Sequence, residues 1–286
     1  MKNQLIIVLA SALAFPACNI QKFALRSIDG MFDNTMIALE GEEDLQIAEP
    51  AIASNLKLLD GLVRTDPENE KLLLMACQGY TSYALAFAED SVDRARLFYT
   101  RAQQYGMRLL VLRGIADSVF ASDPATMRLA LRRLDRDDVP AVFWTVNAWG
   151  SAVNLRREDP SAIASLPTIN AMMEWVMSQD SAYYYGGPML YFGVYYGSLP
   201  SILGGKPDLA KSFFDRAVAA SGGKFLMTYV FYAKTYAIQT QNEDLFVDLL
   251  TRVVQAPADI LPEQNLANAV ARARARSLLG HKADFF

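Results

Sequence analysis

The chain has 286 residues, which is the length of about two ordinary domains or of one repeat-built unit. Hydrophobic residues make up 52% of it, aromatic residues 11% and charged residues 20%, so it can bury a large core and does not have the composition of a disordered protein. The net charge of −4 argues against a nucleic-acid-binding protein with a broad basic face. With one histidine and two cysteines, we expect no metal site, no cofactor and no disulfide framework.

The amino terminus has the pattern of a secretory signal. Lys2 is followed by the apolar run Leu5–Phe15, which is shorter than the ~20 apolar residues that a membrane-spanning helix needs. We therefore expect residues 1–17 to be a signal peptide.

A cysteine stands directly after this signal. Phe15-Pro16-Ala17-Cys18 resembles a bacterial lipobox, in which a small residue precedes the lipidated cysteine, although its first two residues are irregular. We expect lipid attachment at Cys18 and a lipidated tether over residues 18–35. The location would be the periplasm of a Gram-negative-type bacterium, with the protein anchored to a membrane. The alternative is an ordinary cleaved signal with an incidental cysteine.

From residue 36 onward the pattern is helical, and strand signals are scarce. Short polar turns with proline recur where one helix ends and the next begins, at Asp66-Pro67, Ser122-Asp123-Pro124, Glu158-Asp159-Pro160 and Lys206-Pro207-Asp208. The sequence therefore predicts an all-α protein of about a dozen helices, with residues 36–286 forming a single helical-repeat domain.

The helices show traces of an internal repeat. Tetratricopeptide-like hairpins place small, large and small residues four and then three positions apart, so that two helices can approach closely. Three triplets fit this pattern and a fourth fits it poorly, in the order Ala95-Tyr99-Ala102, Ala171-Trp175-Ser178, Ala210-Phe214-Ala217 and Leu245-Leu249-Arg252. We therefore expect degenerate tetratricopeptide-like helical hairpins.

Longer sequence blocks carry a family resemblance. They are Asp138-Val139-Pro140-Ala141, Tyr183-Tyr184-Tyr185-Gly186-Gly187-Pro188, Tyr195-Tyr196-Gly197-Ser198-Leu199-Pro200, Leu203-Gly204-Gly205-Lys206-Pro207, Ser221-Gly222-Gly223-Lys224-Phe225 and Leu266-Ala267-Asn268-Ala269-Val270-Ala271. From about residue 40 to the end, the chain resembles the tetratricopeptide-repeat T component associated with TRAP transporters. The resemblance implies a periplasmic lipoprotein that forms homo-oligomers, expected to be trimers, and docks the transporter's substrate-binding protein. It also suggests a small hydrophobic ligand.

The sequence shows little catalytic machinery. No phosphate-binding loop and no G-x-S-x-G motif occur, Cys77 lies in an apolar helical run, and His281 is near the end of the chain. Acidic clusters such as Glu42-Glu43-Asp44 and Asp135–Asp138 could supply the carboxylate pair of a glycosidase, but most lie at helix starts, where they cap helices. We expect no enzyme, and keep a helical glycan-acting enzyme as the remote alternative.

Aromatic residues are the richer feature. Most of them would fill the repeat core, but stacked hairpins also form a concave groove in which tyrosine and tryptophan bind apolar ligands. The predicted groove residues are Tyr80, Trp144, Asn147, Trp149, Asn154, Tyr191, Tyr195 and Lys234. Three functions follow in order of preference: a TRAP-associated scaffold lipoprotein, a general cell-envelope protein–protein adaptor, and the enzyme.

Overall fold

The computed structural model describes residues 29–156, 158–198 and 205–286. The predicted signal peptide, Cys18 and the first part of the tether lie outside these residues. The described chain contains helices and turns and no strand, so the all-α prediction is confirmed. Its α-helices are α3 (Asp29–Glu40), α4 (Leu45–Thr65), α5 (Glu70–Tyr83), α6 (Val92–Leu112), α7 (Pro124–Leu131), α8 (Val139–Asn154), α9 (Pro160–Ile163), α10 (Leu166–Gln179), α11 (Tyr183–Gly197), α12 (Pro207–Ala220), α13 (Met227–Phe231), α14 (Glu243–Gln255) and α15 (Asn265–Gly280).

The helix starts follow the polar turns seen in the sequence. Asn69 accepts a hydrogen bond from the backbone N–H of Leu72 (3.2 Å) and caps α5. Asp123 accepts from the N–H groups of Ala125 (2.8 Å) and Thr126 (3.1 Å) and caps α7. Such side chains satisfy the backbone donors that the first helical turn leaves unpaired. These two helices therefore begin at polar turns of the kind that the sequence shows.

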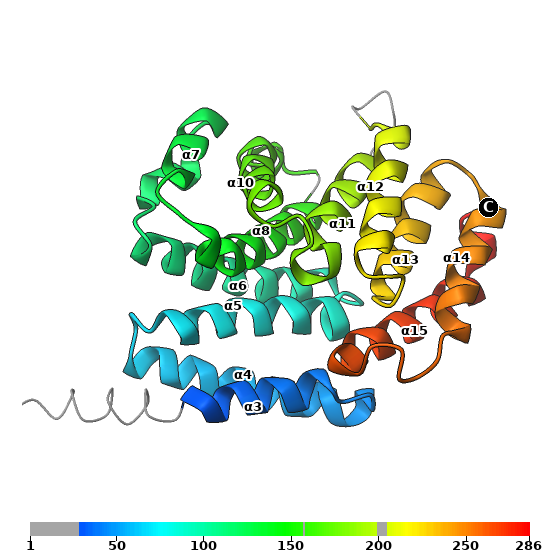
Figure 1. Ribbon diagram of the computed structural model, residues 1–286, viewed down its shortest axis with the longest axis horizontal. Helices are drawn as coiled ribbons and strands as arrows, with labels where there is room; N and C mark the ends of the chain where they lie inside the picture. Colours follow the sequence, from blue (N-terminus) through cyan, green and yellow to red (C-terminus); the bar gives the residue numbers. More distant parts are fainter. Residues whose placement is uncertain (1–28, 157, 199–204) are drawn as a thin grey trace, which may run out of the picture.

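The helices form a curved array that returns on itself (Figure 1). Helices α3 to α6 make one side, α8 and α10 to α12 continue the curve, and α13 and α14 lead to α15, whose amino-terminal end lies beside α3. None of the helices described is long and apolar enough to span a bilayer.

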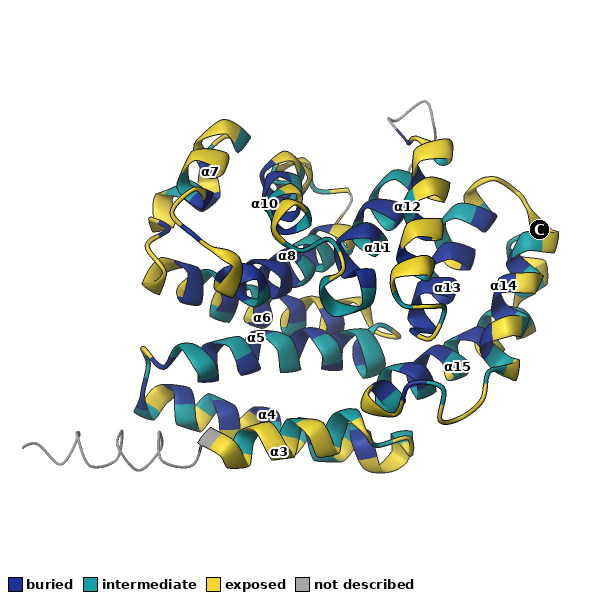
Figure 2. Ribbon diagram, viewed as in Figure 1, coloured by how far each residue is buried: buried dark blue, intermediate teal, exposed yellow. Residues whose placement is uncertain are grey.

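Buried residues line the helix faces that meet one another (Figure 2). Two of the predicted triplets, Ala95-Tyr99-Ala102 and Ala210-Phe214-Ala217, are completely or almost completely buried. In Ala171-Trp175-Ser178 only the alanine is buried, and in Leu245-Leu249-Arg252 only the central leucine. The triplets thus mark helix–helix contacts in part of the array, and the tetratricopeptide-like register between successive hairpins stays a prediction.

Glycine permits the closest helix approach in the core. A Cβ atom at Gly106 of α6 would lie 2.3 Å from Thr145 Oγ1 of α8 and 3.0 Å from Cys77 Sγ of α5. Three helices therefore meet at a point that has no room for a methyl group. Cys77 is 1% exposed and is a free thiol, as expected from its apolar surroundings.

The first helix begins earlier than the sequence indicated. Residues 29–35, which were assigned to the tether, belong to α3. Phe32, Met36 and Leu39 of this helix pack against the main core. Their spacing of four and then three positions is that of one helix face. The tether can therefore extend only to residue 28.

A charged contact joins the last long helix to the turn that follows α5. Arg274 of α15 donates from Nη1 to Glu89 Oε2 (2.9 Å) and from Nη2 to the carbonyl oxygen of Leu85, which lies in a π-helical turn after α5. Tyr99 of α6 donates to the other oxygen of Glu89 (2.8 Å). The Arg274 and Glu89 side chains are only 20% and 23% exposed. One guanidinium thus connects segments 185 positions apart.

Removing this contact should loosen the closure of the array. A double-mutant cycle with Arg274→Ala and Glu89→Gln should give a coupling free energy of about 2 kcal/mol, because charged hydrogen bonds shielded from water are stronger than exposed ones. Urea unfolding of the purified variants measures it. The exposed pair Arg252–Asp248, with side chains 56% and 63% exposed, is the matched control and should couple by about 0.5 kcal/mol or less. Equal coupling free energies for the two pairs would show that the Arg274–Glu89 contact does not hold the array closed.

Candidate functional site

The predicted groove residues are dispersed over the array. Tyr80, Trp144 and Trp149 are buried, with 0%, 5% and 8% of their surface exposed. Trp149 meets Phe120 edge to face at 6.3 Å, which is a core contact. That these three residues line a groove therefore stays a prediction. Of the three, only Trp144 contacts the partly exposed Tyr184.

Tyr80 belongs to a polar network between α4, α5 and α6. Its hydroxyl donates to Asp60 Oδ2 (2.9 Å) and accepts from Arg101 Nη1 (3.0 Å). Tyr105 donates to Asp60 Oδ1 (2.8 Å), and Lys57 donates to Oδ2 (2.7 Å). Burial acts against ionisation of Asp60, but these donors together hold the pKa of its carboxyl below the ordinary value. The network ties three helices together.

The remaining predicted residues also have separate surroundings. Tyr191 and Tyr195 of α11 are partly exposed and stack on each other, with parallel rings 6.4 Å apart, and the Tyr191 hydroxyl donates to Asn170 Oδ1 (2.7 Å). Asn147 donates to the carbonyl oxygen of Phe143 (2.8 Å). The side chains of Asn154 and Lys234 are exposed, at the end of α8 and in the π-helical turn after α13. These contacts do not join the eight residues into one group.

The most unusual backbone of the described chain lies at the start of α11. Tyr184 (φ 46°, ψ 58°), Tyr185 (φ 58°, ψ 36°) and Gly186 (φ 82°, ψ 23°) are consecutive residues in the left-handed conformation. For residues other than glycine this conformation costs of the order of 1–3 kcal/mol each. We call Tyr183, Tyr184, Tyr185 and Gly186 the tyrosine turn.

The tyrosine turn is surrounded by aromatic rings from other elements. Tyr184 contacts Trp144 and Phe143 of α8, with ring centroids 4.9 and 5.8 Å apart. Phe225, just before α13, lies 5.7 Å from Tyr184 and stacks on Tyr185 at 5.2 Å and 8°. The three tyrosines remain partly exposed, so solvent reaches a surface that is otherwise aromatic.

Polar groups from the two ends of the chain lie near these rings. The Tyr184 hydroxyl donates to Gln264 Oε1 (3.2 Å), just before α15. Glu40, the last residue of α3, accepts from Gln78 Nε2 (3.4 Å). Burial raises the pKa of the Glu40 carboxyl. Burial, followed by the negative charge of Glu40, raises the pKa of Tyr184.

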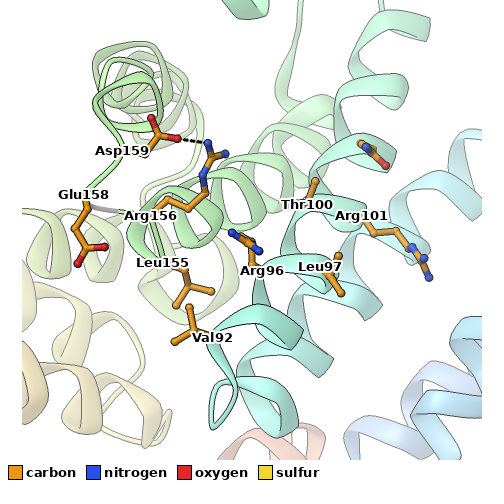
Figure 3. Close-up of a pocket in the computed structure, with 10 residues that line it drawn as sticks. Val92, Arg96, Leu97, Thr100, Arg101, Leu155, Arg156, Glu158 and Asp159 are labelled. Atoms are coloured by element: carbon orange, nitrogen blue, oxygen red, sulfur yellow. Dashed lines mark hydrogen bonds and ion pairs between the residues drawn. The ribbon is translucent and has the colours of Figure 1, made fainter.

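A separate open pocket of about 860 Å³ lies on the surface between α6 and the segment that joins α8 to α9 (Figure 3). Its apolar residues include Val92 and Leu97, which are 56% and 71% exposed. Its charged residues include Arg96 and Arg156, each ion-paired to an aspartate, Asp93 and Asp159. The pocket therefore combines exposed apolar side chains with ion-paired charged ones.

The acidic clusters serve structural purposes. Asp44, Asp135 and Asp159 each cap the helical segment that follows, as the sequence suggested. Among residues 29–156, 158–198 and 205–286, no group of three or more histidine, cysteine or acidic side chains could hold a metal ion. His281 is exposed at the end of α15.

Sequence reasoning omitted the tyrosine turn from the groove. The run of three tyrosines before two glycines and a proline was noted, but only as a family signature. Its left-handed backbone could have been inferred for Gly186, since glycine adopts positive φ freely. No local sequence pattern predicts a left-handed backbone at Tyr184 and Tyr185. Glu40 and Gln264, which lie near these tyrosines, come from distant parts of the chain.

Gly186 should be a stability determinant of the tyrosine turn. A Cβ atom there would lie 3.0 Å from Ala220 Cβ and 3.2 Å from Ala217 Cα, at a φ of +82°. Gly186→Ala should therefore lower the free energy of unfolding by about 2–3 kcal/mol, measured by urea unfolding. Gly222→Ala, which has a φ of +59° but no atom within 4 Å of the new Cβ, should cost only about 1 kcal/mol. A smaller effect at Gly186 than at Gly222 would show that the contact with α12 is not tight.

Comparison with known proteins places the chain in a family. A search of curated proteins found no similar sequence. The family model described as TRAP transporter T-component matches residues 41–286, which include all described helices from α4 to α15. The match covers well over half of the chain. The protein therefore belongs to the TRAP transporter T-component family.

Proposed function

We propose that this protein is a non-enzymatic periplasmic lipoprotein that docks the substrate-binding protein of a TRAP transporter and binds a small hydrophobic ligand. Association with a TRAP transporter follows from family membership, which is also consistent with a periplasmic or membrane-associated location. The proposal adds the docking partner, the ligand, the lipid anchor at Cys18 and a homotrimeric assembly. The observation that carries it is the exposed apolar surface of α6 within a chain of this family.

The open pocket has the composition of a docking surface. Interfaces between soluble proteins place apolar residues at the centre and charged residues at the border. Leu97, 71% exposed, and Val92, 56% exposed, are apolar residues that α6 presents to solvent. Arg96 and Arg156, each ion-paired to an aspartate, line the same pocket. We assign this surface to the substrate-binding protein.

A charge at the centre of this surface should prevent docking. Leu97→Asp should weaken capture of a TRAP substrate-binding protein from the same organism by about tenfold or more, because an interface core tolerates no unpaired charge. Pull-down from detergent-solubilised membranes with native mass spectrometry measures capture and also reports the oligomeric state.

Leu129→Asp provides the matched control. Leu129 is 63% exposed on α7 and does not line the pocket, so this variant should capture the partner normally. Equal capture of the substrate-binding protein by the two variants would show that the pocket is not part of the docking surface. Capture of other envelope proteins in place of a TRAP substrate-binding protein would favour the general adaptor.

A thiol count tests the lipid anchor. Burial raises the pKa of the Cys77 thiol to about 12, so at about pH 8 it stays protonated and shielded from reagents. If Cys18 is acylated, the folded protein should show no thiol reactive towards Ellman's reagent, and a single thiol after denaturation in guanidinium. Cys77→Ala should show none in either state. A reactive thiol in the folded protein would contradict acylation of Cys18.

The ligand is assigned to the tyrosine turn. Ligand sites combine apolar walls with a few polar groups that fix orientation. Here Trp144 and Phe225 stand beside the partly exposed tyrosines, and Glu40 and Gln264 supply polar atoms. The left-handed backbone supports the assignment, because strained residues cluster at ligand-binding sites. Mass spectrometry of organic extracts of the purified protein would test for a retained hydrophobic compound.

A further inference from the structure

The carboxylate of Glu40 lies near the tyrosine turn and is poorly paired. Glu40 is partly buried, and the part of the chain that the structure describes provides no lysine or arginine that pairs with it. Among the described residues, the Gln78 amide donates a hydrogen bond to it, at a long 3.4 Å. A partly desolvated carboxylate without a cation is costly, so this arrangement leaves a negative charge to be compensated.

A second acceptor nearby lacks a donor. Asn265, the first residue of α15, donates from Nδ2 to the carbonyl oxygen of Gly41 (3.4 Å), next to Glu40 in the chain. Its Oδ1 atom is buried without a hydrogen-bond partner among the described residues. Figure 1 shows the end of α3 beside the start of α15, where these groups lie. Two independent observations thus indicate an excess of acceptors where the ends of the array meet.

The aromatic rings suit a positive charge as well. The faces of tyrosine rings attract cations, and sets of such rings bind quaternary ammonium groups. Burial raises the pKa of each of the three tyrosines. Among the nearby charges, Glu40 contributes most at Tyr184, whereas Asp180 contributes more than Glu40 at Tyr183, and Glu263 contributes more at Tyr185. Two hydrogen bonds bring the carboxylate and the rings to the same place. The Tyr184 hydroxyl donates to Gln264, and the next residue, Asn265, donates to the carbonyl oxygen of Gly41 beside Glu40. No lysine or arginine is found over these three rings within the described chain.

We propose that the tyrosine turn and Glu40 bind a quaternary ammonium group, so that the ligand of this protein is a small organic cation with an apolar body. The carboxylate of Glu40 balances the charge, and the rings of the turn contact the methyl groups. This inference rests on the proposed function, since it names the chemical class of the ligand assigned to the same site.

Three probes of the same shape and different charge test the proposal. Choline carries a quaternary ammonium, dimethylbutanol is its uncharged carbon isostere, and dimethylbutanoate is a related anion. Isothermal titration calorimetry with the detergent-solubilised full chain should show choline binding about tenfold or more tightly than dimethylbutanol, and no binding of the anion. This comparison needs no variant and therefore does not depend on folding of a mutant.

A matched pair of variants then tests which carboxylate binds the ammonium group of choline. Glu40→Gln should weaken choline binding by about tenfold and leave the affinity for dimethylbutanol unchanged, because only the ion pair is lost. Glu43→Gln removes the same charge from an exposed position three residues away and should bind choline normally. Thermal unfolding of both variants checks that they fold.

The outcomes separate this inference from the proposed function. If choline and dimethylbutanol bind equally, the cation preference is overturned while an apolar ligand site remains. Absence of choline binding, or equal loss in the Glu40 and Glu43 variants, also overturns it. Capture of the substrate-binding protein is a separate readout, and its failure would overturn the docking proposal without affecting the probe affinities.

Discussion

The contact of Arg274 with Glu89 and with the Leu85 carbonyl ties the last long helix of this protein to the turn after α5. Most contacts in a stacked helical array are between neighbours, so an array by itself has two free ends. Here the last helix returns to the first ones, and Leu45 and Ala86 from the beginning of the chain pack against the carboxy-terminal core. The guanidinium fixes this return because its geometry requires both the carboxylate and the carbonyl to be in place.

The return of the last long helix to the first ones also brings together the side chains of the candidate ligand site. Glu40 ends the first described helix, Tyr184 lies in the middle of the chain and Gln264 precedes the last long helix. Tyr184 bonds Gln264 directly, and Glu40 acts on Tyr184 through its charge. An open array would leave α3 and α15 at opposite ends. The candidate ligand site is thus a consequence of the ring-like arrangement and does not belong to any one hairpin.

How much of this could be read from the sequence depends on the range of the interaction. The helix start at Asp123 and the buried triplet Ala210-Phe214-Ala217 are local patterns and were predicted. Trp149 is predicted to line the groove, and its burial was not predictable, because helical spacing does not reveal which face of a helix its neighbours cover. The Arg274–Glu89 contact is between positions too far apart for any periodicity to indicate it.

The left-handed backbone at Tyr184 and Tyr185 explains how neighbouring side chains can share one partner. In a regular helix, successive side chains point about 100° apart, so adjacent residues do not face the same group. In the tyrosine turn both rings reach Phe225, at 5.7 and 5.2 Å. The aromatic contacts offset the strain of the backbone, and the strain in turn places two rings on one surface.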